Sequence, residues 1–283
     1  MQLLQCTPEK EKGQMQKNKT VLISKKLADV LFHFKNTDEV QILAGCTGTE
    51  IETLKDKSVS IRAIPELLTI DRHERYIEYG SAVTINKIIS SGAGRLPDFF
   101  LDALKSIGTE QIRNIATIGG NICAKGIKHT LWAPLLALNA RLEIKDSTDT
   151  KIVQFSKFNG VPEKKLLTKI RIPLEEWDVQ VFKRIGPTNK LSPLSASFTF
   201  LVETQRGMIA NIRVVFAGNT VFYSPEFENK IIGTRLPLTE KMIDSLIEEA
   251  KTVYKTEKTF ENEDPIIKAQ FLNLLRNSFE QLT

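Results

Sequence analysis

Cysteine and histidine are scarce in this chain, which has only three of each among 283 residues. Cys6, Cys46 and Cys123 share no metal-ligand spacing, and an odd number does not build a disulfide framework. An iron–sulfur cluster normally takes four cysteine ligands. The three histidines lie far apart in the sequence. We therefore expect no cluster and no metal site in this chain, and the residues point to no acid–base catalyst.

Long apolar runs are also missing. No stretch of about eighteen apolar residues, the length that spans a membrane, is present. The first twenty residues are polar and lysine-rich, whereas a secretory signal needs an apolar stretch there. We expect a cytoplasmic protein that makes no use of a membrane.

The chain has no strong excess of one charge. It carries 39 Lys+Arg against 34 Asp+Glu, and the two signs are mixed along its whole length. This pattern is weak evidence for a nucleic-acid surface, so no nucleic-acid partner is predicted. The densest basic cluster, from Lys10 to Lys19, is interpreted as part of a solvated leader.

The familiar nucleotide-binding fingerprints are absent. There is no G-x-G-x-x-G opening a βαβ unit and no G-x-x-x-x-G-K-[ST] anywhere in the chain. A Rossmann fold and a P-loop fold are both disfavoured.

The order of apolar patterns predicts two kinds of structure. Strands alternate with helices up to about residue 160. After residue 165 a predicted strand pair, Ser195 to Val202 with Met208 to Phe216, is followed by two amphipathic helices that begin near Thr239 and at Asp264. We predict an α+β protein with a flexible leader at 1–19, a two-part α/β domain at 20–160 and a small α+β domain at 165–283, an antiparallel sheet with helices.

A first glycine-bearing loop follows a short apolar run that reads as a buried strand. Gly45 and Gly48 could let several backbone N–H groups converge on a diphosphate, and two threonines add hydroxyl donors. Taken alone, the loop is better explained as a plain turn that ends a strand. Its residues are Leu43, Ala44, Gly45, Cys46, Thr47, Gly48 and Thr49.

A second loop contains paired glycines that would let backbone approach a phosphate closely. Thr117 offers a hydroxyl, and the amide of Asn121 can both donate and accept. Glycine pairs are common in turns, so this loop alone is also weak evidence. Its residues are Thr117, Ile118, Gly119, Gly120 and Asn121.

Together, in this order and at this separation, the loops resemble those of the FAD-binding subunit of the xanthine dehydrogenase and carbon monoxide dehydrogenase family of molybdenum hydroxylases. The segment from Gln111 to Ala116, ahead of the second loop, and that from Pro134 to Ala140, behind it, also fit the family. The resemblance covers nearly the whole chain after residue 20. It implies a two-part FAD-binding domain of the vanillyl-alcohol oxidase type, followed by a C-terminal domain like that of carbon monoxide dehydrogenase flavoproteins.

The resemblance implies that the two loops grip the FAD pyrophosphate. By matching position, Leu167 and Lys183 would be further FAD contacts, and Ile107 would lie against the flavin. Thr130 stands where family members usually carry an Asp that fixes the adenosine end.

Two further departures fall in the first loop. Cys46 stands where the family usually has Gly or Asn, and Gly48 where it usually has Asp or Glu. Backbone donors survive these changes, but anchoring contacts are lost, so weak FAD binding is expected. A cysteine in a turn is more often simply small than reactive.

The function that the resemblance implies is electron transfer. A [2Fe–2S] small subunit would pass electrons from a molybdenum-cofactor large subunit to the flavin, and NAD⁺ or another acceptor would take them on. Two alternatives remain open: a scaffold or assembly subunit that has lost FAD, and a solitary flavin oxidase. The oxidase would need catalytic residues of its own, and the chain after Pro173 has no histidine.

Overall fold

The computed structural model describes residues 2–5, 20–49, 53–187, 191–256 and 264–283. By its internal contacts the chain forms two compact units, each assembled from segments that are distant in sequence. The first unit comprises Met1–Ser91, Glu110–Cys123 and Ala140–Pro173, and the second comprises Gly92–Thr109, Ala124–Asn139 and Leu174–Thr283.

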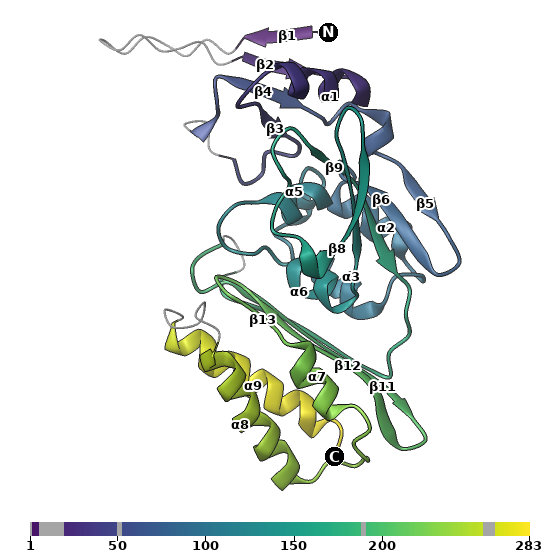
Figure 1. Ribbon diagram of the computed structural model, residues 1–283, viewed down its shortest axis with the longest axis vertical. Coiled ribbons are helices and arrows are strands. Elements are labelled where there is room, and N and C mark those ends of the chain that lie inside the picture. Colours follow the sequence, from purple (N-terminus) through teal and green to yellow (C-terminus); the bar gives the residue numbers. More distant parts are fainter. Residues whose placement is uncertain (1, 6–19, 50–52, 188–190, 257–263) are drawn as a thin grey trace. The chain divides into compact units, whose positions relative to one another are not determined.

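The first unit contains a small, largely parallel sheet with the strand order β1-β2-β4-β3. Helix α1 connects β2 to β3, and its side chains Val30, Leu31 and Phe34 are buried in one cluster with Val59 of β4. Such β-α-β connections place a helix on one face of a parallel sheet. The elements are β1 (Gln2–Gln5), β2 (Thr20–Ile23), α1 (Leu27–Asn36), β3 (Gln41–Leu43) and β4 (Lys57–Ser60) (Figure 1).

A second sheet of this unit is antiparallel throughout, with the order β5-β6-β9-β7-β8. From Thr168 to Pro173 the residues of its central strand β9 alternate between buried and partly exposed, as expected of a strand that is covered on one face. The short helix α5 packs against β9. The elements are η2 (Pro65–Leu67), β5 (Ile70–Arg72), β6 (Tyr76–Gly80), α2 (Ile85–Gly92), α4 (Glu110–Arg113), α5 (Ile118–Cys123), β7 (Arg141–Lys145), β8 (Thr150–Gln154), η3 (Phe155–Lys157) and β9 (Leu166–Pro173).

The second unit is built on a four-stranded antiparallel meander, β10-β11-β12-β13. Phe198, Phe200 and Val202 of β11 lie in one core with Phe271 and Phe279 of the last helix. Figure 1 shows α6 on one side of β11 and β12 and the helices α7, α8 and α9 on the other. The elements are α3 (Asp98–Lys105), α6 (Trp132–Ala137), β10 (Val179–Ile185), β11 (Ala196–Gln205), β12 (Met208–Ala217), β13 (Val221–Tyr223), α7 (Pro225–Ile231), α8 (Glu240–Thr256) and α9 (Pro265–Glu280).

The predicted α+β fold and the antiparallel C-terminal sheet with its two final helices are confirmed. The boundary predicted near residues 160–165 differs from the division into compact units, because α3 packs on β10 and α6 packs on β11 and β12. Part of the predicted leader, Gln2–Gln5, forms β1 and pairs with β2. Met1 and residues 6–19, including the lysine-rich cluster, lie outside the described residues.

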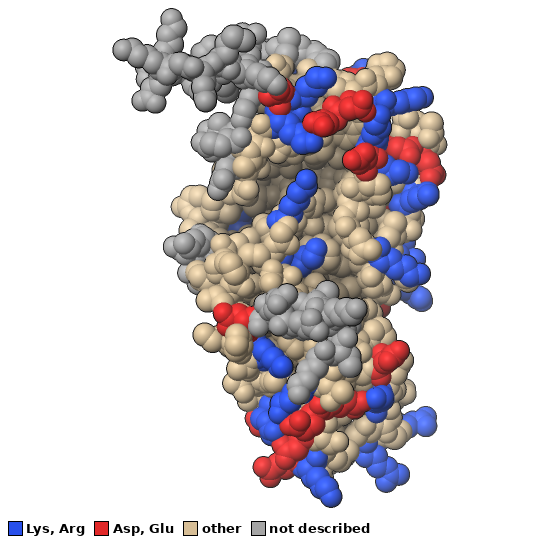
Figure 2. Space-filling view, turned by 60° about the vertical axis from the view of Figure 1, so that its left-hand side comes forward, with Lys and Arg blue, Asp and Glu red and all other residues tan. Residues whose placement is uncertain are grey.

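Charged side chains of both signs are interspersed on the face drawn in Figure 2. For the residues that the structure describes, no helix is long and apolar enough to cross a membrane.

Candidate functional site

The first predicted loop begins where β3 ends, at the carboxyl edge of the parallel sheet. Cys46 has φ 55°, in the left-handed region that costs a residue with a Cβ about 1–2 kcal/mol. The amide of Thr49 donates to the carbonyl of Cys46 at 3.4 Å and closes the turn. Cys46, Thr47 and Gly48 are exposed.

The backbone amides of residues 45–48 have no acceptor among the described residues. Successive N–H groups on both sides of a left-handed residue form a concave group of donors that suits an anion. A cradle of this kind fits one phosphate of a dinucleotide, and it needs no particular side chain.

The second predicted loop is organised differently, because most of it is helical. Helix α5 begins at Ile118, and the backbone amides of residues 118–121 already have acceptors. Ile118 donates to the carbonyl of Val83 at 3.1 Å, and Gly119 donates to that of Ser81 at 2.9 Å. The side chain of Thr117 accepts from Gly120 at 3.1 Å, and its carbonyl accepts from Asn121 at 3.0 Å. At residues 118–121 this loop therefore offers no set of free amides to a ligand.

The two loops lie together in the first unit. A Cβ added to Gly45 would stand 2.1 Å from the carbonyl oxygen of Ile115 and 3.1 Å from the Cα of Ala116. Backbone therefore packs directly on backbone where the chain enters the second loop, and only glycine permits this approach. The prediction that these two distant stretches of sequence come together is confirmed.

In each loop one glycine has no room for a Cβ atom, whereas the other is less crowded. At Gly119 a Cβ would lie 2.6 Å from the carbonyl oxygen of Ser81, whereas at Gly120 it would meet only the Thr117 hydroxyl, at 3.0 Å. Around Gly48 none of the described residues lies within 4 Å of such an atom. The close contacts thus join Gly45 to Ile115 and Gly119 to Ser81.

The other predicted FAD contacts divide between the two units. Leu167 is buried in β9 of the first unit, opposite Ile144. Ile107, Thr130 and Lys183 belong to the second unit. Thr130 is 7% exposed, and Lys183 pairs with Phe198 in the meander. The FAD contacts of all four residues stay predictions.

The thiol of Cys46 shows no sign of activation. Partial desolvation raises its pKa, and the nearby charge of Arg62 opposes that shift. A raised pKa leaves the thiol protonated near neutral pH, whereas a reactive cysteine needs the thiolate.

Two residues that the sequence did not single out help to form the site. Ile115 supplies the carbonyl on which Gly45 packs, and Ser81 supplies the carbonyl that accepts from Gly119. The Ser81 hydroxyl is buried and has no hydrogen-bond partner among the described residues. No local pattern could have revealed these roles, because each depends on a contact between segments that are distant in sequence.

The described residues contain no group of three or more His, Cys, Asp or Glu side chains that could hold a metal ion.

Residues 15–175 match the family described as the FAD binding domain in molybdopterin dehydrogenase. The chain belongs to this family, as the resemblance predicted, and the cofactor of the family is FAD.

The relatives found among known proteins carry the names of oxidoreductases or of oxidoreductase subunits. The xanthine dehydrogenase FAD-binding subunit of Escherichia coli O157:H7 is 29% identical over 182 residues, 62% of this chain and 60% of that protein. An indole-3-acetaldehyde oxidase of Zea mays is 38% identical over 99 residues, 32% of this chain and only 7% of that protein. The matched region is therefore a small part of the plant enzymes.

Solved structures share the fold. A chain of carbon monoxide dehydrogenase from Hydrogenophaga pseudoflava has a TM-score of 0.79 at 17% identity, covering 93% of this chain and 96% of that chain. A chain of quinoline 2-oxidoreductase from Pseudomonas putida 86 has a TM-score of 0.75 at 15% identity, covering 93% and 94%.

Proposed function

We propose that this chain is the FAD-carrying electron-transfer subunit of a molybdenum hydroxylase. The observation that carries the proposal is the contact of Gly45 with Ile115, which brings four unpaired amides of the first loop beside the second loop. Family membership gives the cofactor, and the name of the Escherichia coli relative gives the kind of subunit.

In this proposal the amides of residues 45–48 hold the negative charge of the FAD pyrophosphate, and the Thr117 hydroxyl and the Asn121 side chain complete the grip. When bound, FAD accepts electrons one at a time and releases them in pairs. The protein's own task is to hold the cofactor in place.

The partners in the proposal are a [2Fe–2S] small subunit and a molybdenum-cofactor large subunit, with NAD⁺ or another compound as the electron acceptor. With three cysteines in all, the chain falls short of the four ligands that a cluster normally takes. This shortage is consistent with a division of labour in which another subunit holds the cluster.

FAD is expected to bind more weakly than in relatives with the usual residues. Cys46 occupies a left-handed position that suits glycine, Gly48 brings no carboxylate to the first loop, and Thr130 replaces an Asp. The loss of one or two charged hydrogen bonds, each worth about 1.5–3 kcal/mol, would weaken binding by roughly tenfold or more.

Reconstitution of the purified chain with FAD tests the proposal. We expect a flavin absorption spectrum that remains after gel filtration, with one FAD per chain. Protein that stays colourless in excess FAD would contradict the proposal and favour a scaffold subunit. Purification from the native source separates the remaining alternative, because a solitary oxidase would not bring with it a small iron–sulfur subunit and a large molybdenum subunit.

A further inference from the structure

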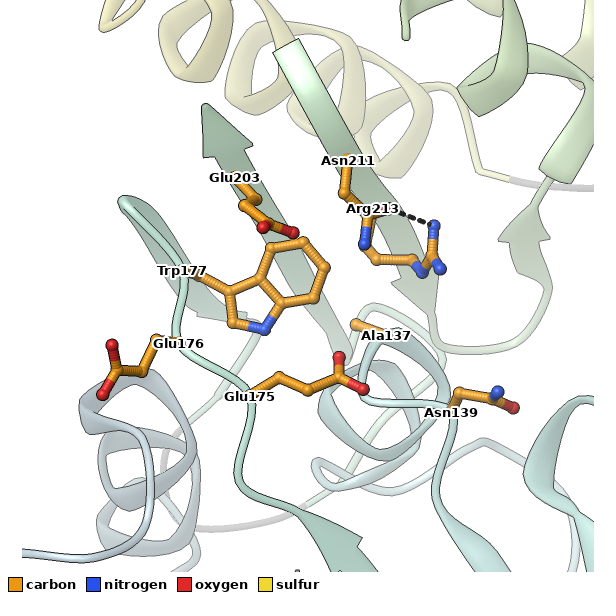
Figure 3. Close-up of a pocket in the computed structure, with 8 residues that line it drawn as sticks. All are labelled: Ala137, Asn139, Glu175, Glu176, Trp177, Glu203, Asn211 and Arg213. Carbon is orange, nitrogen blue, oxygen red and sulfur yellow. Dashed lines mark hydrogen bonds between the residues drawn. The ribbon is translucent and has the colours of Figure 1, made fainter. Parts of the chain in front are cut away.

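The second unit contains a cleft of about 440 Å³ that the proposed function leaves unused. Three segments line it: the end of α6, the connection between β9 and β10, and the β11–β12 hairpin. Its size falls within the range of about 300–1,000 Å³ that is usual for small-molecule sites. Figure 3 shows the side chains of Glu175, Trp177, Glu203, Asn211 and Arg213 around the cleft.

Two carboxylates of the cleft have no cationic partner. Glu175 and Glu203 are exposed, and neither forms an ion pair within the described part of the chain. The pKa of Glu175 is raised by desolvation first, lowered by the charge of Arg213 and raised again by Glu203. The charges of Arg213 and Glu203 therefore reach Glu175 across the cleft. A third carboxylate, that of Glu176, points away from them in Figure 3.

The guanidinium of Arg213 is fixed through one of its nitrogens. Its Nη1 donates to Asn211 Oδ1 at 2.9 Å and to the carbonyl of Ile212 at 2.8 Å, and it lies 3.4 Å from the buried carboxylate of Glu228. Nε and Nη2 have no acceptor among the described residues. These two nitrogens present the paired donors that a carboxylate binds in a bidentate fashion.

Trp177 adds a donor without an acceptor. Its side chain is 6% exposed, and the indole Nε1 has no hydrogen-bond partner among the described residues. In Figure 3 this nitrogen lies on the edge of the ring that faces Glu175. A buried N–H group without an acceptor costs free energy, which an incoming oxygen atom would recover.

We propose that this cleft binds a basic amino acid such as lysine or arginine. The carboxylates of Glu175 and Glu203 would take the two cationic groups of the ligand. Arg213 would take its carboxylate through Nε and Nη2. A simple organic cation would leave both donors unmet, and an acidic ligand would meet two carboxylates, so neither complements the cleft.

Calorimetric titration of the full chain with L-arginine and with L-lysine is the direct test. We expect saturable binding of at least one of them at concentrations up to about 10 mM. Agmatine, which lacks the carboxylate of arginine, should bind about tenfold more weakly, because the charge-assisted bonds to Arg213 are lost. L-Glutamate should not bind.

Substitutions in the cleft test whether the amino acid binds there. Glu175→Gln and Glu203→Gln should each weaken binding about fivefold to tenfold, since each removes one charged acceptor. Glu248→Gln changes charge equally on the exposed face of α8, where Glu248 pairs with Lys251, and should leave binding unaltered.

A spectroscopic readout reports on the cleft itself. The chain has two tryptophans, Trp132 and Trp177, so a ¹⁵N-labelled sample shows two indole N–H signals, which Trp177→Phe assigns. The Trp177 signal should shift on addition of the ligand, while that of Trp132 stays in place.

Several results would overturn the proposal. They are the absence of binding by either amino acid, equal affinity for agmatine and arginine, and an affinity that Glu175→Gln and Glu203→Gln leave unchanged. Displacement of the ligand by Mg²⁺ at equal concentration would show a site for metal ions instead. Failure of FAD to bind would not affect this test, because the glycine loops lie in the first unit and the cleft lies in the second.

Discussion

The two glycine loops look alike in sequence and differ in structure. In the first loop the amides of residues 45–48 are unpaired within the described chain, and the one tight contact is that of Gly45 with Ile115. In the second loop the amides of residues 118–121 are all engaged, and the tight contact is that of Gly119 with Ser81. A glycine pair therefore does not by itself indicate a phosphate cradle.

The comparison assigns a separate task to each loop. On the proposed function, the first loop presents backbone donors for the cofactor, whereas the second loop contributes side chains and the residues directly before it support the first loop. Substitutions at the glycines can separate the two tasks, because ligand affinity and folding stability are measured independently.

The largest effect is expected for Gly45→Ala. The new Cβ would overlap the carbonyl of Ile115, and two backbone segments would have to move apart. We expect a loss of about 3 kcal/mol in the free energy of unfolding, the upper end for overpacking, together with FAD affinity reduced more than tenfold. Denaturant unfolding and flavin titration measure the two quantities.

Gly48→Ala is the matched control, since nothing lies near its Cβ and its φ is not positive. Its stability should equal that of the wild type. Wild-type stability in Gly45→Ala would mean that the loops do not pack as described.

An intermediate effect is expected when the two glycines of the second loop are compared. Gly119→Ala would press on the carbonyl of Ser81 and should cost about 1–3 kcal/mol. Gly120→Ala would meet only the Thr117 hydroxyl, at 3.0 Å, and the preference of alanine for a helix offsets a small shift of that side chain, so the free energy of unfolding should change by less than about 1 kcal/mol. Thermal unfolding of the pair distinguishes them.

Flavin titration of the same pair tests the assignment of tasks. If Gly120→Ala lost FAD binding at normal stability, the second loop would contact the cofactor at this glycine or through the neighbouring Thr117 hydroxyl, and its part in binding would be larger than the contrast between the loops suggests.

The smallest effect is expected for Cys46→Gly. Glycine relieves the left-handed strain at φ 55°, so the free energy of unfolding should rise by about 1 kcal/mol. A better-formed cradle should tighten FAD binding by up to about fivefold. Cys46→Ala keeps the Cβ and should show neither gain, which separates backbone strain from any role of the thiol.

Much of the fold could be predicted from local patterns. The apolar patterns from Ser195 to Val202 and from Met208 to Phe216 predicted a strand pair, and the structure has the antiparallel pair β11 and β12 there. The amphipathic periods after Thr239 and Asp264 predicted α8 and α9, and Asp264 caps the latter by accepting from the amide of Ile266 at 2.8 Å.

The candidate site was predictable only in part. Both loops were found from their glycines, but the prediction treated Thr117 to Asn121 as an open turn, whereas α5 begins within it. The charged cleft around Arg213 was not predicted at all. Its side chains come from α6, from the β9–β10 connection and from a hairpin, and no spacing in the sequence relates them.

The sequence alone determined which segments become helices and strands, and which short stretches are free of bulky side chains, because these properties depend on neighbouring residues. Only the tertiary structure decided that Gly45 rests on Ile115, that the second loop uses its own amides and that two unpaired carboxylates share a cleft with Arg213. The physical reason is that hydrogen bonding, close packing and charge at these positions depend on contacts between residues far apart in the chain.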